Sequence, residues 1–288
     1  MIRLSGVLAA SLLLPVAWVG CYVFPNPPPD WQGDFTARNV LARAEVAMGP
    51  QADRPEPDAT PDPDAPDLFN PKPIPPSPPQ DLIASVTVIR PQAGELSMLV
   101  KWRRGGDWSV DMTEKSGAAV RYLRSGLGAV EIRKGQVVRK DVPLDEIGIR
   151  TFLRCLFAVP YFQSGPGSEP EIVESLELGD GAHVINLRKY DERGLKWILS
   201  IESSTARPAR LQEWMFVSEE EGRARDTYLR EFATDRRGHL YPKRLVTYDG
   251  KTEIQDMLIR DLDWDQGLRD ADFAMPKGPS ESSINRWP

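Results

Sequence analysis

Apolar and polar residues alternate with a period of two through most of the chain after Asp81. The alternation is clearest at residues 82–89 and 96–103, where it is typical of half-buried β-strands. Residues 91–94 contain proline and glycine, so we expect these two strands to pair as an antiparallel hairpin. Shorter segments with the same pattern follow, at residues 107–112, 120–123, 129–133, 136–139, 172–178, 183–190, 196–202, 209–217, 226–234, 243–248 and 253–263.

Two segments have the spacing of helices instead. Residues 36–48 repeat small or apolar side chains at helical spacing, with Thr36 as a possible N-cap and glycine and proline just after them. In residues 149–157 the apolar side chains recur at i, i+3, i+4, i+7 and i+8, which places Arg150 and Arg154 on the opposite face. We expect Pro160 to end this second helix.

The fold class expected from these elements is α+β and mainly antiparallel β. About a dozen strands form one sheet, and open twisted sheets rarely exceed about ten strands without curling. We therefore predict that the sheet curls or closes into a barrel, with helices covering or plugging its concave face. The chain has no internal repeat at a fixed period, which argues against a propeller.

The N-terminus predicts export and attachment to a membrane. Arg3 precedes the almost wholly apolar residues 4–19, and Gly20 precedes Cys21, which resembles a bacterial lipobox. We expect lipid on Cys21; an uncleaved membrane helix over residues 4–24 and simple cleavage with secretion are the alternatives. Tyr22 follows the cysteine, where an aspartate would favour retention in the inner membrane, so we expect an outer-membrane lipoprotein that faces the periplasm.

The remaining composition divides the chain into regions. Proline-rich stretches bury too little apolar surface to fold and are typical of tethers and disordered segments. The predicted regions are a signal peptide (1–21), a tether (22–33), the N-terminal helix (34–49), an acidic, proline-rich disordered insertion (50–80), the half-barrel (81–277) and a C-terminal tail (278–288).

Charge and motifs exclude several classes of function. The net charge is −6 and no basic stripe is present, so nucleic acid is not an expected partner. The chain has two histidines without metal-ligand spacing and no motif of nucleotide binding or nucleophilic catalysis. Cys155 lies in the apolar helical pattern and is expected to be a structural thiol, while the alternating Asp261, Asp263 and Asp265 are interpreted as a solvated strand face. We expect no enzyme activity and no cofactor.

Four segments of the C-terminal part resemble a known family. They are WILSI (197–201), ARPARL (206–211), GHLYPKRL (238–245) and DADFAMP (270–276), in this order. They resemble the bacterial outer-membrane lipoprotein-sorting family, which is LolA/LolB-like, and the resemblance covers roughly the last 200 residues. It implies an incomplete antiparallel barrel whose apolar concave face receives the acyl chains of lipoproteins or lipids.

The candidate site is an apolar face on adjacent strands and the helix above them. Its candidate residues are Met98, Val100, Trp102, Trp108, Val110, Phe152 and Phe157. Two interpretations stay open, because these side chains can line a hydrophobic cavity for an acyl chain or can pack an ordinary core.

The leading hypothesis is a membrane-anchored envelope protein that binds acyl chains and takes part in lipoprotein sorting or transfer to the outer membrane. The alternative is an envelope sensor or scaffold that binds a protein partner through the same fold. A hydrolase is a third possibility, and it would need a cluster of perturbed carboxylates in a cleft.

Overall fold

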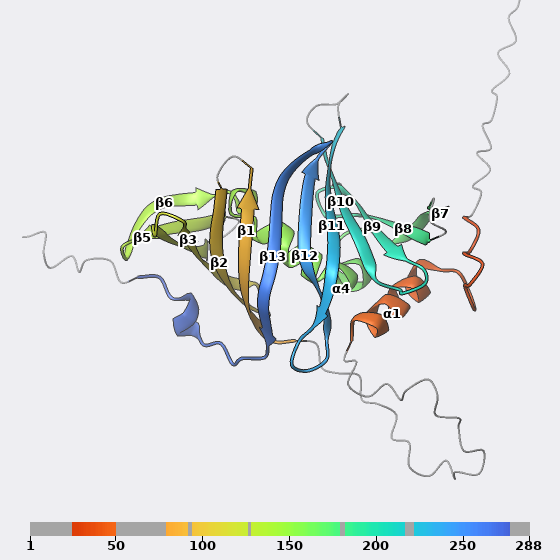
Figure 1. Cartoon of the computed structure of the whole chain (residues 1–288), viewed down its shortest axis with the longest axis horizontal. Coiled ribbons are helices and arrows are strands. Elements are labelled where there is room, and N and C mark those ends of the chain that lie inside the picture. The colour runs from red at the N-terminus through yellow and green to blue at the C-terminus, as the bar shows by residue number, and fades with distance from the viewer. Residues whose placement is uncertain are drawn as a thin grey trace, which may run out of the picture.

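The strands form a single antiparallel sheet. The computed structural model describes residues 25–49, 79–91, 94–125, 128–178, 182–216 and 222–276. These residues contain one sheet of 13 strands (Figure 1). The strands are β1 (Asp81–Arg90), β2 (Gly94–Arg103), β3 (Asp107–Glu114), β4 (Ala119–Ser125), β5 (Gly128–Arg133), β6 (Gln136–Val142), β7 (Glu171–Glu177), β8 (His183–Tyr190), β9 (Lys196–Glu202), β10 (Pro208–Phe216), β11 (Gly222–Thr234), β12 (Leu240–Asp249) and β13 (Thr252–Trp264).

The sheet consists of two meanders that meet in its middle. The chain starts at the central strand β1 and runs outward strand by strand to the edge strand β6. It re-enters at the other edge, β7, and runs inward to β13, which pairs with β1. The sheet is open between β6 and β7, so the predicted incomplete barrel is confirmed. The predicted β1–β2 hairpin is confirmed too, with Arg90 opposite Gly94.

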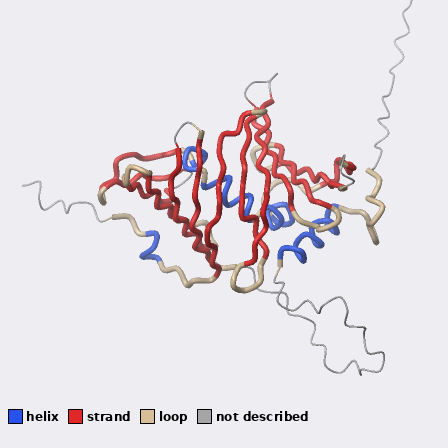
Figure 2. The backbone as a smooth tube through the Cα atoms, in the orientation of Figure 1, coloured by secondary structure: helices blue, strands red, loops and turns tan. Residues whose placement is uncertain are grey.

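Helices lie on one face of this sheet (Figure 2). Helices α2 (Leu144–Ile147), α3 (Ile149–Leu156) and α4 (Ala158–Ser164) connect the two edge strands across the concave face, and α1 (Ala37–Met48) packs against α4. The hydroxyl of Thr36 accepts a hydrogen bond from the Asn39 N–H at 3.2 Å, which confirms the predicted N-cap. The 3-10 helix η2 (Asp270–Phe273) follows the last strand and contacts β3.

The prediction that Pro160 ends the second helix was wrong. α3 ends at Leu156, a kink follows at Phe157, and Pro160 is the third residue of the new helix α4. Proline is tolerated in the first turn of a helix, because the N–H groups there have no intrahelical acceptor to lose. The proline therefore marks the start of a second short helix.

The core lies between the concave face and the helices. Alternate strand residues point into it: on β2, Met98 and Val100 are 1% and 0% exposed, while Leu99 between them is 37% exposed. Phe152 of α3 and Phe162 of α4 fill the same cluster from the helical side, and both are fully buried. The period-two pattern thus assigned the strand faces correctly.

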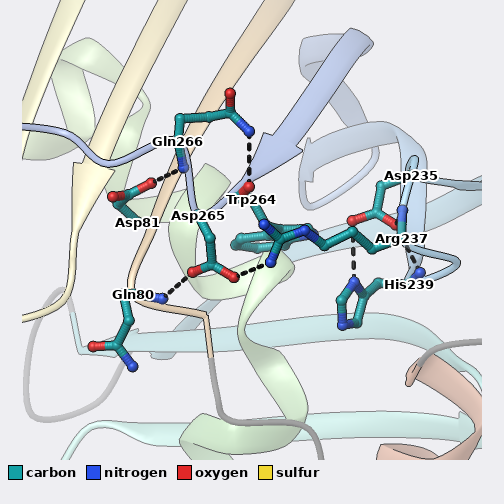
Figure 3. A network of polar contacts seen from close by, with 8 residues as sticks. All are labelled: Gln80, Asp81, Asp235, Arg237, His239, Trp264, Asp265 and Gln266. Atoms are coloured by element: carbon teal, nitrogen blue, oxygen red, sulfur yellow. Dashed lines mark hydrogen bonds and ion pairs between the residues drawn. The ribbon is translucent and has the colours of Figure 1, made fainter.

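Polar contacts fasten the place where the two meanders meet (Figure 3). The Asp81 carboxylate at the start of β1 accepts a hydrogen bond from the Gln266 N–H just after β13. The Asp265 carboxylate accepts one from the Gln80 N–H at 2.7 Å and pairs with Arg237 of the β11–β12 turn. Since these contacts join residues far apart in sequence, they fix the register of the first and last strands.

Candidate functional site

The candidate residues all belong to the hydrophobic core under the helices. Five of them are buried members of the main cluster, namely Met98, Val100, Trp108, Val110 and Phe152, and the other two, Trp102 and Phe157, are partly buried and pack against it. Register places Val100 opposite Val110 and Trp102 opposite Trp108, so these strands present one continuous apolar face. In this structure the side chains pack on one another, and entry of an acyl chain stays a prediction.

An aromatic group forms one end of this apolar face. The rings of Trp102 and Phe157 have their centroids 4.7 Å apart, and those of Phe157 and Trp264 are 5.6 Å apart. Trp264 is 7% exposed and was missing from the sequence-based candidates. Its alternation with Asp263 and Asp265 was the available signal, because a tryptophan between two solvated residues of a strand points to the opposite, buried face.

The helices α2–α4 form a covering segment that is joined covalently to the sheet at its two ends. Gly148 lies between α2 and α3 with φ of 81°, a conformation that L side chains rarely adopt. A Cβ there would lie 2.8 Å from the Gln255 amide nitrogen and 2.9 Å from the Met257 methyl group. Both atoms end flexible side chains, so it is the positive φ that favours glycine where the segment bends over β13.

A buried lysine of the sheet holds the far end of the covering segment. Lys189 of β8 is 2% exposed, and its ammonium donates hydrogen bonds to the carbonyl oxygens of Tyr161, Phe162 and Gly165 at 3.2, 3.3 and 2.6 Å. Burial lowers the pKa of this ammonium. A cation at a helix C-terminus interacts favourably with the exposed carbonyl groups, so Lys189 fixes the end of α4 to the sheet.

A small pocket lies where α3 crosses β9, β10 and β11. Arg154 belongs to the face of α3 opposite its apolar side chains, as predicted, but the sheet covers this face as well: the Arg154 guanidinium lies 3.9 Å from the Trp197 ring centroid and 3.4 Å from the Glu213 carboxylate. Burial lowers the pKa of Arg154. The concave sheet contacts α3 beyond its apolar stripe. The helical pattern alone does not indicate this wider contact. The pocket is lined by Arg150, Thr151, Arg154, Trp197, Leu211, Glu213, Arg225 and Thr227.

A second hollow of about 340 Å³ lies between β3, β4, β5 and the segment after η2. Its lining includes Met112, Val120 and Arg121. η2 is held beside it by ion pairs, of which Lys101 to Asp272 measures 2.7 Å. The hydrogen bond from Lys101, followed by one from the Arg269 N–H, lowers the pKa of the Asp272 carboxyl.

The described residues offer little support for metal or thiol chemistry. They contain no group of three or more His, Cys, Asp or Glu side chains placed to hold a metal ion. His239 contacts Asp235 at 3.1 Å within the β11–β12 turn (Figure 3). Cys155 is 2% exposed, and burial raises the pKa of its thiol to about 12, so this thiol is protonated and unreactive.

Several predictions fall on residues that the structure does not describe. Cys21, the N-terminal residues 1–24, most of the predicted insertion at 50–80 and the tail at 278–288 lie outside the described residues. Within the described ranges, no helix combines the length and the apolar character needed to cross a membrane.

Comparison with known proteins gives structural likeness only. No protein-family model matches the chain, and no curated protein matches it. A LolA superfamily protein from Nitrosomonas europaea is 14% identical with a TM-score of 0.48, over 84% of this chain and 98% of that one. A domain from Vibrio parahaemolyticus named as an outer-membrane lipoprotein-sorting protein is 12% identical with a TM-score of 0.42. The match covers 67% of this chain and 89% of that domain. The Pseudomonas aeruginosa MucA/MucB complex is 9% identical with a TM-score of 0.26, over 82% of this chain and 60% of that one.

The solved structures that resemble this chain thus include LolA superfamily and lipoprotein-sorting proteins, the resemblance that the sequence suggested. At these identities and scores the likeness says nothing about what this chain binds.

Proposed function

We propose that this chain is a membrane-anchored envelope protein that binds acyl chains of lipoproteins or lipids and takes part in lipoprotein sorting or transfer to the outer membrane. The observation that carries the proposal is the apolar concave face of an open sheet, covered by helices that are not part of the sheet. The proposal assigns no covalent chemistry and no cofactor to the chain.

The covering segment gives acyl chains a route to this face. α2–α4 contact the sheet through side chains and through Lys189, so they can move away from it without breaking a strand pairing. Each CH₂ group of an acyl chain that then enters the apolar face contributes about 0.8 kcal/mol. Candidate residues such as Val100 and Phe152 would contact the ligand in place of each other.

The N-terminal sequence supports the location. A lipid on Cys21 would hold the chain at a membrane. The prediction that residues 22–33 are a free tether was wrong for their second half, because Asp30 accepts a hydrogen bond from the Ser203 hydroxyl at 3.0 Å and Trp31 packs against the core. We expect replacement of Cys21 by serine to release the chain from the membrane fraction. Retention of a Cys21→Ser variant would favour the uncleaved helix instead.

Native mass spectrometry tests the ligand. A form beginning at Tyr22, exported to the periplasm, is expected to carry a lipid or acylated peptide that denaturation releases. We expect Val100→Trp to reduce this occupancy, because a larger side chain fills the apolar face, while the same change at the exposed neighbour Leu99 leaves it unaltered. Absence of any acyl species, together with no uptake of a fluorescent fatty acid, would refute acyl binding.

Two observations favour a second candidate, an envelope sensor or scaffold that binds a protein partner. The apolar side chains under the helices are packed, and the edge strand β6 exposes Val137 and Val138 by 41% and 53%. An open edge can accept an added strand from a partner. This candidate predicts that Val138→Pro, which blocks strand addition, abolishes capture of an envelope protein without changing lipid occupancy.

A further inference from the structure

The N-terminal segment is fixed to one place on the sheet. Pro28 is buried, and the Asp30 carboxylate accepts a hydrogen bond from the Ser203 hydroxyl at 3.0 Å. Trp31 packs against the core, and the Arg43 guanidinium of α1 lies 4.4 Å from the centroid of its ring. Because these contacts hold the segment, the chain leaves the folded part at a defined position.

This position is beside the β7–β8 hairpin. Ser203 directly follows β9, and its N–H donates a hydrogen bond to the His183 carbonyl oxygen, where β8 begins, at 2.8 Å. His183 is opposite Glu177, the last residue of β7. Figure 1 shows the N-terminal segment next to this hairpin. A membrane anchor at the N-terminus therefore leads to the β7–β8 turn.

The distance to the predicted anchor is short. Cys21 lies four residues before Pro25, the first residue that the structure describes. Four residues span at most about 14 Å. β8 (His183–Tyr190) by contrast extends about 24 Å away from the hairpin turn. The anchored membrane therefore lies nearer to the β7–β8 turn than to the β8–β9 turn at the other end of the strand.

The hairpin carries an apolar patch on its surface. Leu176 and Leu178 are 40% and 45% exposed. Strand alternation places both on one face and Glu177 on the other. The half-buried Val184 of β8 is opposite Leu176 and extends the same face. Single exposed leucines are common on protein surfaces, but these two share a face where the N-terminal segment leaves the fold. We call Leu176, Leu178 and Val184 the hairpin patch.

We propose that the hairpin patch lies against the membrane that holds the anchor, with Leu176 and Leu178 entering the boundary between lipid headgroups and acyl chains. The inference rests on the proposed anchoring through Cys21 and adds which surface of the fold faces the bilayer. Transfer of apolar side chains out of water favours this contact. The anchor keeps the patch close to lipid, so a small patch is sufficient. The edge strand β6, at the opposite end of the sheet, then points away from the membrane.

The test uses the full chain, reconstituted through its anchor into vesicles of phosphatidylethanolamine and phosphatidylglycerol. An environment-sensitive fluorophore is attached to a Leu178→Cys variant, and the unsubstituted chain gives the background labelling. Its emission should shift to the blue and should be quenched by a lipid with a nitroxide near its headgroup. Glu192→Cys is the matched control, because that residue is exposed in the β8–β9 turn. The same probe there should keep the emission of an aqueous environment.

A second substitution tests the patch itself. Leu176→Asp, introduced into the Leu178→Cys chain, should reverse most of the blue shift and the quenching, because a carboxylate on the same face opposes entry into lipid. Leu99→Asp is its control, since Leu99 of β2 is similarly exposed at 37% and lies outside the patch. It should leave both signals unchanged. Near-ultraviolet circular dichroism should show that all variants fold.

The outcomes separate this inference from the anchoring on which it rests. If the chain stays with the vesicles but the probes at positions 178 and 192 give the same emission, the orientation is overturned while anchoring holds. If the chain does not stay with the vesicles, anchoring itself fails. If the probe at position 178 is shielded from aqueous iodide but is not quenched by the nitroxide lipid, another protein chain covers the hairpin patch and membrane contact is overturned.

Discussion

Replacing Lys189 by methionine removes the contact that fixes the end of α4 to β8. Methionine keeps most of the unbranched side chain and its packing but has no ammonium. Three carbonyl oxygens then lose the donor that they share. The carbonyl oxygen of Tyr161 keeps one hydrogen bond, from the Gly165 N–H at 2.9 Å. The carbonyls of Phe162 and Gly165 are left without this donor, the first in a buried place and the second in a part-buried one.

The size of the effect follows from these contacts. Each unsatisfied carbonyl costs about 1–3 kcal/mol, so the two together cost about 2–6 kcal/mol. Removing a buried ammonium returns part of this, because its desolvation no longer opposes folding. We expect Lys189→Met to lower the free energy of unfolding by about 2–4 kcal/mol.

Urea unfolding of a form beginning at Tyr22, followed by tryptophan fluorescence, measures this change. Hydrogen exchange adds a local test, since the amides of α4 (Ala158–Ser164) should exchange faster while those of β1 and β13 change least. Lys243→Met is the control, because that lysine is exposed on β12, and it should cost less than about 0.5 kcal/mol. A loss for Lys189→Met as small as that of the control, with unchanged exchange in α4, would refute the reasoning.

Three further predictions concern the core, the thiol and the C-terminal segment. Phe152→Ala should lower the free energy of unfolding by about 3–5 kcal/mol in the same urea assay, because Phe152 is fully buried. Leu99→Ala should lower it by much less, because Leu99 is partly exposed. Cys155 should resist a thiol reagent at neutral pH until the chain unfolds, because burial raises the pKa of its thiol to about 12; labelling at the rate of a free thiol would contradict its burial. The pKa of the Asp272 carboxyl is lowered by Lys101. The stability that the ionised carboxyl contributes is therefore complete above its ordinary pKa of 3.8 and is lost as the pH falls through the lowered pKa. Protection of the amides at residues 270–273 from hydrogen exchange, relative to the intrinsic exchange rate at each pH, should therefore fall in acid, and an Asp272→Asn variant should lack this pH dependence.

Local patterns determined most of the elements. The first strand was predicted at residues 82–89 and is Asp81–Arg90, and the ninth was predicted at residues 196–202 and is Lys196–Glu202. The first helix begins where Thr36 was expected to cap it. These features succeed from sequence because alternation, helical spacing and capping depend on neighbouring residues alone. The burial of Cys155 follows in the same way from its place on the apolar side of a helix.

Only the tertiary structure decided which elements meet. The pairing of β1 with β13 joins residues such as Val86 and Ile259, which no local pattern connects. The same holds for the contact of Trp102 and Phe157 and for the carbonyl groups that Lys189 holds. Periodicity tells which side chains share a face of a strand, but the opposing element is selected by the whole sheet.

Arg154 illustrates the difference most clearly. The helical pattern assigned it to the polar side of α3, and that assignment describes the helix correctly by itself. The curved sheet then extends beyond the apolar stripe and brings Trp197 and Glu213 against this polar side. The sequence determined the apolar face, and the curvature of the sheet decided that the polar face of the same helix would be covered as well, since a helix on a concave surface has more than one side in contact.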